Sequence, residues 1–213
     1  MRFSELDGRS IGLWGLGRET RSLAEQVRAR LPGARIEVLV ADEGADLEGV
    51  RVVPQAAAVA ALRACDVVVR SPGVSIHRPE IHVLAEHGVR VVTATGLWLA
   101  EREGRRVIGV TGTKGKSTTA TMAAHLVRAS GLRAHLAGNI GRPVLDLLDA
   151  PADEWAVVEL SSYQIADLVT GPEVAVVTNL YREHIDWHGD EGTYRREKLR
   201  LLGLPGVGAC VIS

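Results

Sequence analysis

The sequence predicts an α/β fold made of two parallel-sheet domains. Short apolar runs rich in β-branched residues alternate with helical patterns along the 213 residues, as in buried parallel strands that are joined by helices. In each half of the chain, a glycine-rich turn follows the first of these runs. Hydrophobic residues make up 46% of the chain, which is enough to fill the cores of two small domains.

The first half is expected to form a Rossmann-like domain over residues 1–94. Between its first two apolar runs, Leu23, Ala24, Val27 and Leu31 recur at helical spacing, which predicts a strand, a helix and a second, parallel strand. The runs that we expect to be strands are residues 10–15, 35–42, 65–71 and 89–94.

The second half is expected to form an α/β domain of the P-loop ATPase type over residues 106–213, after a charged linker at residues 95–105. A helix is predicted directly after its glycine-rich turn, over residues 117–130. Because a strand-like run closes the sequence with nothing after it, we expect this domain to be incomplete. The predicted strands are residues 106–112, 155–162, 173–180 and 209–213.

Composition and charge exclude several classes of protein. The formal net charge is -1, with 25 basic and 26 acidic residues interspersed, so we expect no nucleic-acid-binding surface. No apolar run approaches the roughly 20 residues that span a bilayer, and we expect no membrane insertion. Cys65 and Cys210 lie among alanines and valines without neighbouring metal ligands, so both are expected to be buried and reduced. These features predict a cytoplasmic protein.

The first glycine-rich turn, GLGRET at residues 15–20, has the position of a dinucleotide-binding turn. Gly15 and Gly17 would let the backbone approach a diphosphate, whose charge the N-terminus of the following helix would favour. Asp42, the last residue of the second predicted strand, could accept a hydrogen bond from a ribose hydroxyl or a base. The turn alone fits nucleotide binding and a purely structural tight turn equally well, because Thr20 replaces the third glycine of the motif.

A second turn follows the third predicted strand, where Ser71, Pro72 and Gly73 stand in sequence. Ligands of open α/β folds bind at the edge of the sheet where the parallel strands end. The turn therefore adds a second element for ligand binding, although by itself it would be an ordinary turn.

The second glycine-rich turn, GVTGTKGKST at residues 109–118, has the context of a phosphate loop between a strand and a helix. Backbone N–H groups from Thr113 to Lys116 are expected to form an anion nest, with the Lys116 ammonium near the β- and γ-phosphates. Ser117 would offer a hydroxyl oxygen to Mg²⁺. A glycine-rich turn with a surface lysine is the less favoured alternative. The expected ATP contacts are Gly112, Thr113, Lys114, Gly115, Lys116, Ser117 and Thr118.

The spacing of the glycines in this loop is unusual, since Val110 stands where the common phosphate loop has its first glycine. The arrangement of Gly109, Gly112 and Gly115 before Lys116 resembles the ATP loop of the Mur ligase family. The resemblance extends over nearly the whole chain, because further stretches match that family in order. They are GLG (15–17), SPG (71–73), GNIG (138–141), ELSSYQ (159–164), TNLYREHID (178–186) and YRREK (194–198).

The resemblance implies an ATP-dependent amide ligase of peptidoglycan precursor synthesis, and it favours the branch that joins glutamate to UDP-N-acetylmuramoyl-L-alanine. Such enzymes transfer the γ-phosphate of ATP to a substrate carboxylate, and the amine of the amino acid then displaces phosphate from the acyl phosphate. Two anionic reactants must meet, so catalysis depends on cations and positioning. The catalytic residues that the resemblance implies are Lys116, His184 and Lys198.

The resemblance also implies two Mg²⁺ ions. Glu159 would join Ser117 on the first ion, and His184 and Lys198 would serve the second, with Lys198 as a carbamate made with CO₂. A carbamate supplies oxygen ligands where a bare ammonium cannot. Without the resemblance, Glu159 could cap a turn and Lys198 could be a solvated helix residue.

The spacing of His184 and His188 raises the alternative of a zinc site, because two histidines four residues apart share a helix face. A zinc protease motif needs a glutamate directly after the first histidine, and Ile185 stands there. The sequence therefore favours a packing or capping role for His188 and Asp186.

Binding of the UDP-linked substrate is implied for a further set of side chains. Asn139, Ser161 and Gln164 would reach this substrate near its reacting carboxylate, with the capping of loops at strand ends as their alternative role. Arg18 and Glu19 depart from the short or polar residues that the family pattern leads us to expect beside the diphosphate, and Arg18 could bind the diphosphate instead.

Several alternatives stay open on the sequence alone. Another Mur-type ligase would differ in the added amino acid or in D- against L-glutamate, whereas the folate branch would lack residues 1–94. A non-catalytic nucleotide-binding module belongs to another class, and a NAD-dependent oxidoreductase leaves the second glycine loop unexplained. The family resembled here has a third, C-terminal domain, so we expect a monomer whose residues 1–213 alone have little or no ligase activity.

Overall fold

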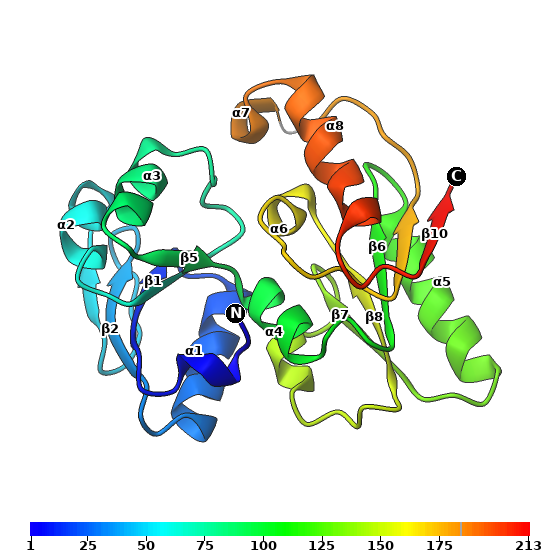
Figure 1. Cartoon of the computed structure of the whole chain (residues 1–213), viewed down its shortest axis with the longest axis horizontal. Helices are drawn as coiled ribbons and strands as arrows, with labels where there is room; N and C mark the ends of the chain where they lie inside the picture. Colours follow the sequence, from blue (N-terminus) through cyan, green and yellow to red (C-terminus); the bar gives the residue numbers. More distant parts are fainter. Residues whose placement is uncertain (184) are drawn as a thin grey trace.

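The computed structural model describes residues 1–183 and 185–213 and consists of two α/β halves that lie side by side (Figure 1). Each half is built around a sheet of five strands, and the paired strands run parallel throughout both sheets. The strand orders are β3-β2-β1-β4-β5 and β10-β9-β6-β8-β7. The predicted fold class is confirmed.

In the first half, the four predicted strands are present, and the apolar side chains of β1 and β4 are buried on both faces of the sheet. A short edge strand, β3, was not expected, because three residues carry no readable periodicity. The elements are η1 (Ser4–Leu6), β1 (Ser10–Trp14), α1 (Arg18–Arg30), β2 (Arg35–Val40), β3 (Arg51–Val53), η2 (Gln55–Ala57), α2 (Ala58–Leu62), β4 (Val67–Arg70), α3 (Pro79–Glu86) and β5 (Arg90–Val92).

The segment between the sheets, expected to be a charged linker, begins with the helix α4 (Ala94–Glu101). Thr93 caps the helix by accepting a hydrogen bond from the Gly96 N–H at 3.1 Å, and Leu97 and Trp98 are buried. The same hydrophobic cluster contains core residues of both sheets. The two halves are therefore packed together through α4, and the exposed charged residues of the expected linker are found only after this helix, at Glu103 and Arg105.

In the second half, the four predicted strands are again present. The strand β7 was not expected, because its sequence AHLAG lacks β-branched residues. The elements are β6 (Val107–Thr111), α5 (Lys116–Ala129), β7 (Ala134–Gly138), η3 (Val144–Leu147), β8 (Trp155–Glu159), α6 (Ser162–Ile165), β9 (Val174–Val177), α7 (Ile185–His188), α8 (Glu191–Leu199), η4 (Arg200–Gly203) and β10 (Ala209–Ile212).

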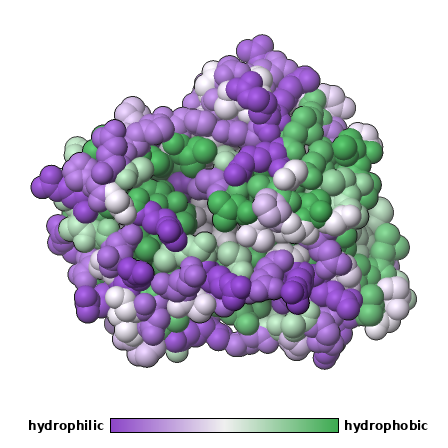
Figure 2. Space-filling model, viewed as in Figure 1, coloured by the Kyte–Doolittle hydropathy of each residue, from purple (hydrophilic) through white to green (hydrophobic). Residues whose placement is uncertain are grey.

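The strand β10 forms one edge of the second sheet, and all four of its residues are exposed. The expectation that Cys210 is buried is therefore wrong, whereas Cys65 is buried as expected. Apolar surface gathers on the side of the molecule where β10 and α5 lie (Figure 2), and it includes Met122, Leu126 and Ile212. Among the described residues, no helix has the length and apolar character needed to cross a membrane.

Candidate functional site

The first glycine-rich turn and the SPG turn lie against each other at the carboxyl edge of the first sheet. Gly15 follows β1 and Ser71 follows β4, which are neighbouring strands. A methyl group at Gly15, where φ is +85°, would lie 2.9 Å from the Ser71 Cβ. The order of the sheet also reverses here, since β2 and β4 lie on opposite sides of β1. This is the place where open α/β sheets bind their ligands.

The local structure explains why the turn lacks its third glycine. Thr20 is buried, and its hydroxyl accepts a hydrogen bond from the Gly17 N–H at 2.8 Å. Thr20 thereby caps α1, a role that a glycine could not perform. Asp42 lies exposed just beyond β2 at the same edge of the sheet, and beyond β4 Pro72 is half-buried and Gly73 is exposed.

Arg18 and Glu19, which follow this turn, reach across to the second half of the molecule. The Arg18 guanidinium donates to the carbonyl of Gly141, in the GNIG stretch. Glu19 accepts hydrogen bonds from the Gln164 amide and, at 3.2 Å, from the Thr95 hydroxyl. Burial raises the pKa of Glu19, and these two hydrogen bonds oppose that shift. The two side chains thus join the two halves of the molecule beside the first glycine-rich turn.

The phosphate loop connects β6 to α5, and three glycines in and beside it are required by geometry. Gly112 has a φ of +142°, and a Cβ there would lie 1.9 Å from the Thr178 hydroxyl oxygen. A Cβ at Gly109 would lie 2.8 Å from the Pro172 side chain, so this position permits close packing on β6. Gly115 adopts the left-handed conformation directly before the helix.

The anion nest is shorter than the sequence predicts. The N–H groups of Thr113 and Lys114 donate to the backbone and side-chain oxygens of Asn179, at 2.9 and 2.8 Å. The first N–H groups of α5 have no partner within the helix and lie at its positive end, so they suit a phosphate. The first two residues of the expected nest, Thr113 and Lys114, thus direct their N–H groups to Asn179 and not to an open site.

The Thr113 side chain points into the protein and stabilises the phosphate loop from its buried side. Its buried hydroxyl lies 2.7 Å from the Tyr194 hydroxyl on α8 and accepts a hydrogen bond from the Tyr181 N–H at 2.9 Å. The loop is thereby fixed to two segments that follow it by more than sixty residues. The role of Lys114 is also peripheral, since its ammonium is exposed and pairs with Glu183 at 2.8 Å.

Three of the predicted side chains meet at the carboxyl edge of the second sheet. The buried Glu159 carboxylate ends β8 and accepts hydrogen bonds from the Ser117 hydroxyl at 2.7 Å and the Asn139 amide at 2.9 Å. A buried carboxylate beside a serine hydroxyl supplies the hard oxygen ligands that Mg²⁺ prefers. The residues present therefore fit a Mg²⁺ ion at this position.

Two lysines lie at the base of the loop. The Lys116 ammonium donates to the Thr113 carbonyl at 2.8 Å, and the Lys198 ammonium donates to the Gly112 carbonyl at 2.7 Å. Lys198 is buried, which excludes the alternative of a solvated helix residue. Burial, together with repulsion from Lys116, lowers the pKa of Lys198 to about 7. At that pKa a large fraction of the amine is neutral near pH 7, and the neutral form is the one that reacts with CO₂.

Ser161, Gln164 and His184 are the remaining predicted site residues. The Ser161 hydroxyl accepts the Gln164 N–H at 3.3 Å in a capping box at the start of α6, so the alternative capping role is present in both residues. His184, the expected ligand of a second Mg²⁺, lies outside the described residues.

An ion pair between the halves that contains a buried arginine was missed on the sequence. Arg70, the last residue of β4, is fully buried and pairs with Asp167 at 2.8 Å. It also donates to the carbonyls of Val74 at 2.9 Å and Tyr163 at 3.0 Å. Burial raises the pKa of Asp167, and Arg70 opposes the shift. An arginine at the end of a run of valines was the available signal, because such a charge must find a partner.

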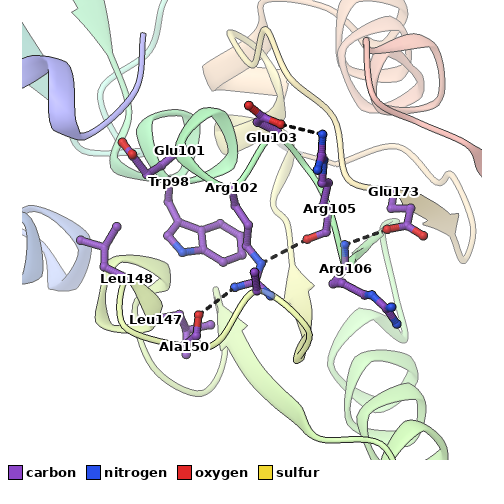
Figure 3. A pocket seen from close by; sticks show the side chains of 11 residues that line it. Trp98, Glu101, Arg102, Glu103, Arg105, Arg106, Leu147, Leu148, Ala150 and Glu173 are labelled. Carbon is purple, nitrogen blue, oxygen red and sulfur yellow. Dashed lines mark hydrogen bonds and ion pairs between the residues drawn. The ribbon is translucent and has the colours of Figure 1, made fainter.

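A cavity of about 470 Å³ lies elsewhere, between α4 and the segment after η3 (Figure 3). Its lining includes Arg106 and Glu173, which directly precede β6 and β9, so it is at the amino ends of these strands. Its polar groups bind one another: Arg102 donates to the Ala150 carbonyl at 3.4 Å, and Arg105 pairs with Glu103 at 3.0 Å. The cavity is thus separate from the phosphate loop, which lies at the opposite edge of the sheet.

Comparisons with known proteins show which family the chain resembles. Residues 110–212 match the family described as the Mur ligase middle domain. The chain is 44% identical over 217 residues to the UDP-N-acetylmuramoyl-L-alanine--L-glutamate ligase of Xanthomonas euvesicatoria pv. vesicatoria, and the match covers 95% of this chain and 46% of the relative. A protein of the same name from a Micromonospora species is 44% identical over 209 residues, covering 95% and 45%. The chain spans about half the length of these curated relatives.

Solved structures support the fold. The UDP-N-acetylmuramate:L-alanyl-gamma-D-glutamyl-meso-diaminopimelate ligase of Neisseria meningitides has a TM-score of 0.56 at 20% identity, covering 96% of this chain and 71% of its own. The UDP-N-acetylmuramate-alanine ligase of Thermotoga maritima has a TM-score of 0.51 at 19% identity, covering 96% and 49%.

Proposed function

The chain belongs to the Mur ligase family, and from that premise we propose that it forms the substrate- and ATP-binding parts of an enzyme that adds L-glutamate to UDP-N-acetylmuramoyl-L-alanine. The relatives that match 95% of the chain are named for this reaction with L-glutamate. Their names favour the L-enantiomer, which the sequence alone left open. A cytoplasmic location and a monomeric state belong to the same proposal.

The observation that carries the proposal is the group of side chains around the phosphate loop. Ser117 and Glu159 are in contact at 2.7 Å, and Lys116 and Lys198 lie on adjacent loop carbonyls. This arrangement suits phosphoryl transfer, which needs positive charge and positioning and no acid–base pair. A non-catalytic nucleotide-binding module would not require the buried Lys198.

Each residue has a defined part in the proposed reaction. The N-terminus of α5 and the Lys116 ammonium would hold the β- and γ-phosphates of ATP and reduce their repulsion of the incoming carboxylate. Asn139, which is fixed by Glu159, would help to place that carboxylate beside the γ-phosphate. Ser117 and Glu159 would hold a Mg²⁺ ion, which supplies charge neutralisation at the phosphates when it is bound. His184 and a carbamate of Lys198 are proposed for a second ion.

The uridine diphosphate is proposed to bind at the paired turns of the first sheet. Gly15, Gly17 and the SPG turn form the carboxyl edge there, and the bond from Arg18 to Gly141 connects this edge to the GNIG stretch beside Asn139. A substrate seated on the first sheet would therefore extend its reacting end toward the phosphate loop. The Gln164 amide would be released for this substrate only by giving up its bonds to Glu19 and Thr95.

The test is a ligation assay on the full-length protein with UDP-N-acetylmuramoyl-L-alanine, ATP, Mg²⁺ and either L- or D-glutamate. We expect ATP-dependent formation of the L-glutamyl product, with D-glutamate a poor substrate. Ligation of D-glutamate, or of another amino acid, would instead assign the chain to another branch of the family. The Glu159→Ala and Lys198→Ala variants should lose the activity, and full activity in both would contradict the proposed site.

A further inference from the structure

Two histidines and a glutamate meet where the two halves of the molecule touch, and the glutamate directly precedes Lys198 on α8. His77 lies in the loop between β4 and α3, His188 ends α7, and Glu197 lies on α8. One ligand atom from each residue lies within 4.8 Å of the other two. One oxygen of the Glu197 carboxylate is 2.7 Å from the His77 Nε2, and the other contacts the His188 Nδ1.

We propose that His77, His188 and Glu197 bind one Zn²⁺ ion, which ties the first half of the molecule to α7 and α8. Two imidazole nitrogens and a carboxylate oxygen are a zinc ligand set that leaves a fourth position for water. Zinc bonds of about 2.0–2.1 Å place the ligand atoms of a tetrahedral site roughly 3.4 Å apart. The Glu197 oxygens now lie closer than that to the two imidazole nitrogens, and the three ligand atoms lie within 4.8 Å of one another, so small side-chain adjustments would form the site.

The surroundings of His188 are those of a metal ligand held in place. Its ring is buried, and its other nitrogen, Nε2, lies 2.9 Å from the Ser162 hydroxyl. When Nδ1 binds the metal, the ring proton resides on Nε2 and is donated to Ser162, which fixes the tautomer. The Trp187 and Tyr194 rings pack against the imidazole at 4.5 and 5.3 Å and keep its orientation. His77 is 42% exposed and gives the ion a route from solvent.

The chemistry of this cluster separates it from the Mg²⁺ position at the phosphate loop. Ser117 and Glu159 offer oxygen atoms alone, which suit a hard cation, whereas two imidazoles favour zinc and other transition metals over Mg²⁺. The proposal is also independent of the ligase function, because it concerns a bond between the two halves. A bound ion would stiffen α8, whose Tyr194 contacts both His188 and the Lys198 ammonium.

The experiment is a metal titration of the chelator-treated protein, with Zn²⁺ in competition with a chromophoric chelator and with Co²⁺ followed by visible absorption. We expect one equivalent to bind, with the absorption of a four-coordinate, nitrogen-ligated Co²⁺ ion, and Zn²⁺ to raise the melting temperature. His77→Ala and Glu197→Gln should weaken binding at least tenfold and remove the thermal shift. His77 is the main target because its exposed side chain is the least needed for folding.

Two variants locate the ion. His125→Ala removes an exposed histidine on α5, and Glu159→Gln removes the carboxylate at the phosphate loop; both should leave the zinc affinity unchanged. The proposal is overturned if the wild-type protein binds no equivalent of Zn²⁺ or Co²⁺, or if His77→Ala and Glu197→Gln bind as tightly as the wild type. It is also overturned if Glu159→Gln abolishes binding, because the ion would then lie at the phosphate loop.

Discussion

The two glycine-rich turns occupy equivalent places in the two sheets, but they are built for different kinds of binding. Each follows a central strand, β1 or β6, and leads into a helix. The first turn packs against the SPG turn, and the charged residues after it reach across to the other half. The second turn has two lysines at its base and a buried carboxylate beside its serine. The first turn thus offers a ligand mainly backbone groups and close packing, whereas the second turn offers charged side chains.

Alanine substitutions at one glycine of each turn should show the largest difference between the turns, in the loss of free energy of unfolding. Gly112→Ala places a Cβ 1.9 Å from the Thr178 hydroxyl oxygen, and that hydroxyl cannot turn away without losing its 2.7 Å bond to the Lys114 carbonyl. We expect the free energy of unfolding to fall by about 3 kcal/mol or more. Gly15→Ala, with a Cβ 2.9 Å from Ser71, should cost about 2 kcal/mol. Chemical denaturation measures both.

Gly131→Ala is the matched control, because its φ of +85° equals that of Gly15 while no atom lies within 4 Å of the added Cβ. It isolates the cost of the backbone conformation, which should be about 1 kcal/mol. Equal losses at Gly131 and Gly112 would contradict the role of the Thr178 contact.

The same contrast shows how much the sequence could predict. Both glycine turns and eight strands followed from residue patterns, because regular periodicity and loop chemistry are local, whereas the Ser117–Glu159 pair was implied by the family resemblance. Thr113 illustrates the limit: its hydroxyl binds Tyr194 on α8, a contact that depends on how two distant segments pack. The contacts of Arg18, Glu19 and Arg70 between the halves were likewise inaccessible, since nothing local indicates which element a side chain will meet. Cys210 was misjudged because an apolar strand at a sheet edge resembles a central one.

Removal of charge from the second turn should weaken ATP binding strongly. Lys116→Ala deletes the ammonium at the loop base, and loss of a charge-assisted contact to phosphate corresponds to a tenfold to hundredfold lower affinity, about 1.5–3 kcal/mol. Calorimetry with a non-hydrolysable ATP analogue and Mg²⁺ measures it. Lys114→Ala is the control, because this exposed ammonium pairs with Glu183 and should contribute little. In the first turn, Arg18→Ala should leave ATP affinity unchanged. An equal loss in Lys114→Ala would argue against the distinct position of Lys116.

The lowered pKa of Lys198, beside the second turn, predicts that folding stability and carbamate formation depend on pH. Because its pKa is about 7 and the ordinary value is 10.5, the folded state binds fewer protons than the unfolded state between these values. The contribution of Lys198 to stability therefore increases as the pH rises through this window and is least favourable below pH 7. With ¹³C-labelled bicarbonate, a carbamate NMR signal should appear as the pH rises through about 7 and be absent from Lys198→Ala. A signal that persists in that variant would show that another amine reacts.

Glu19, which follows the first turn, predicts a smaller pH dependence of folding stability. Burial raises its pKa above 4.5, so the folded state binds more protons than the unfolded state above that pH, and stability falls as the pH rises through the raised value. Glu19→Gln removes the buried charge but keeps an oxygen that can accept from Gln164 or Thr95. We expect the variant to be more stable at pH 7 by roughly 1 kcal/mol, with a flatter dependence of stability on pH. Glu25→Gln, at an exposed position of the same helix, should change neither. A destabilised Glu19→Gln protein would mean that the ionised carboxylate, and with it the attraction from Arg70 and Arg18, holds the two halves together.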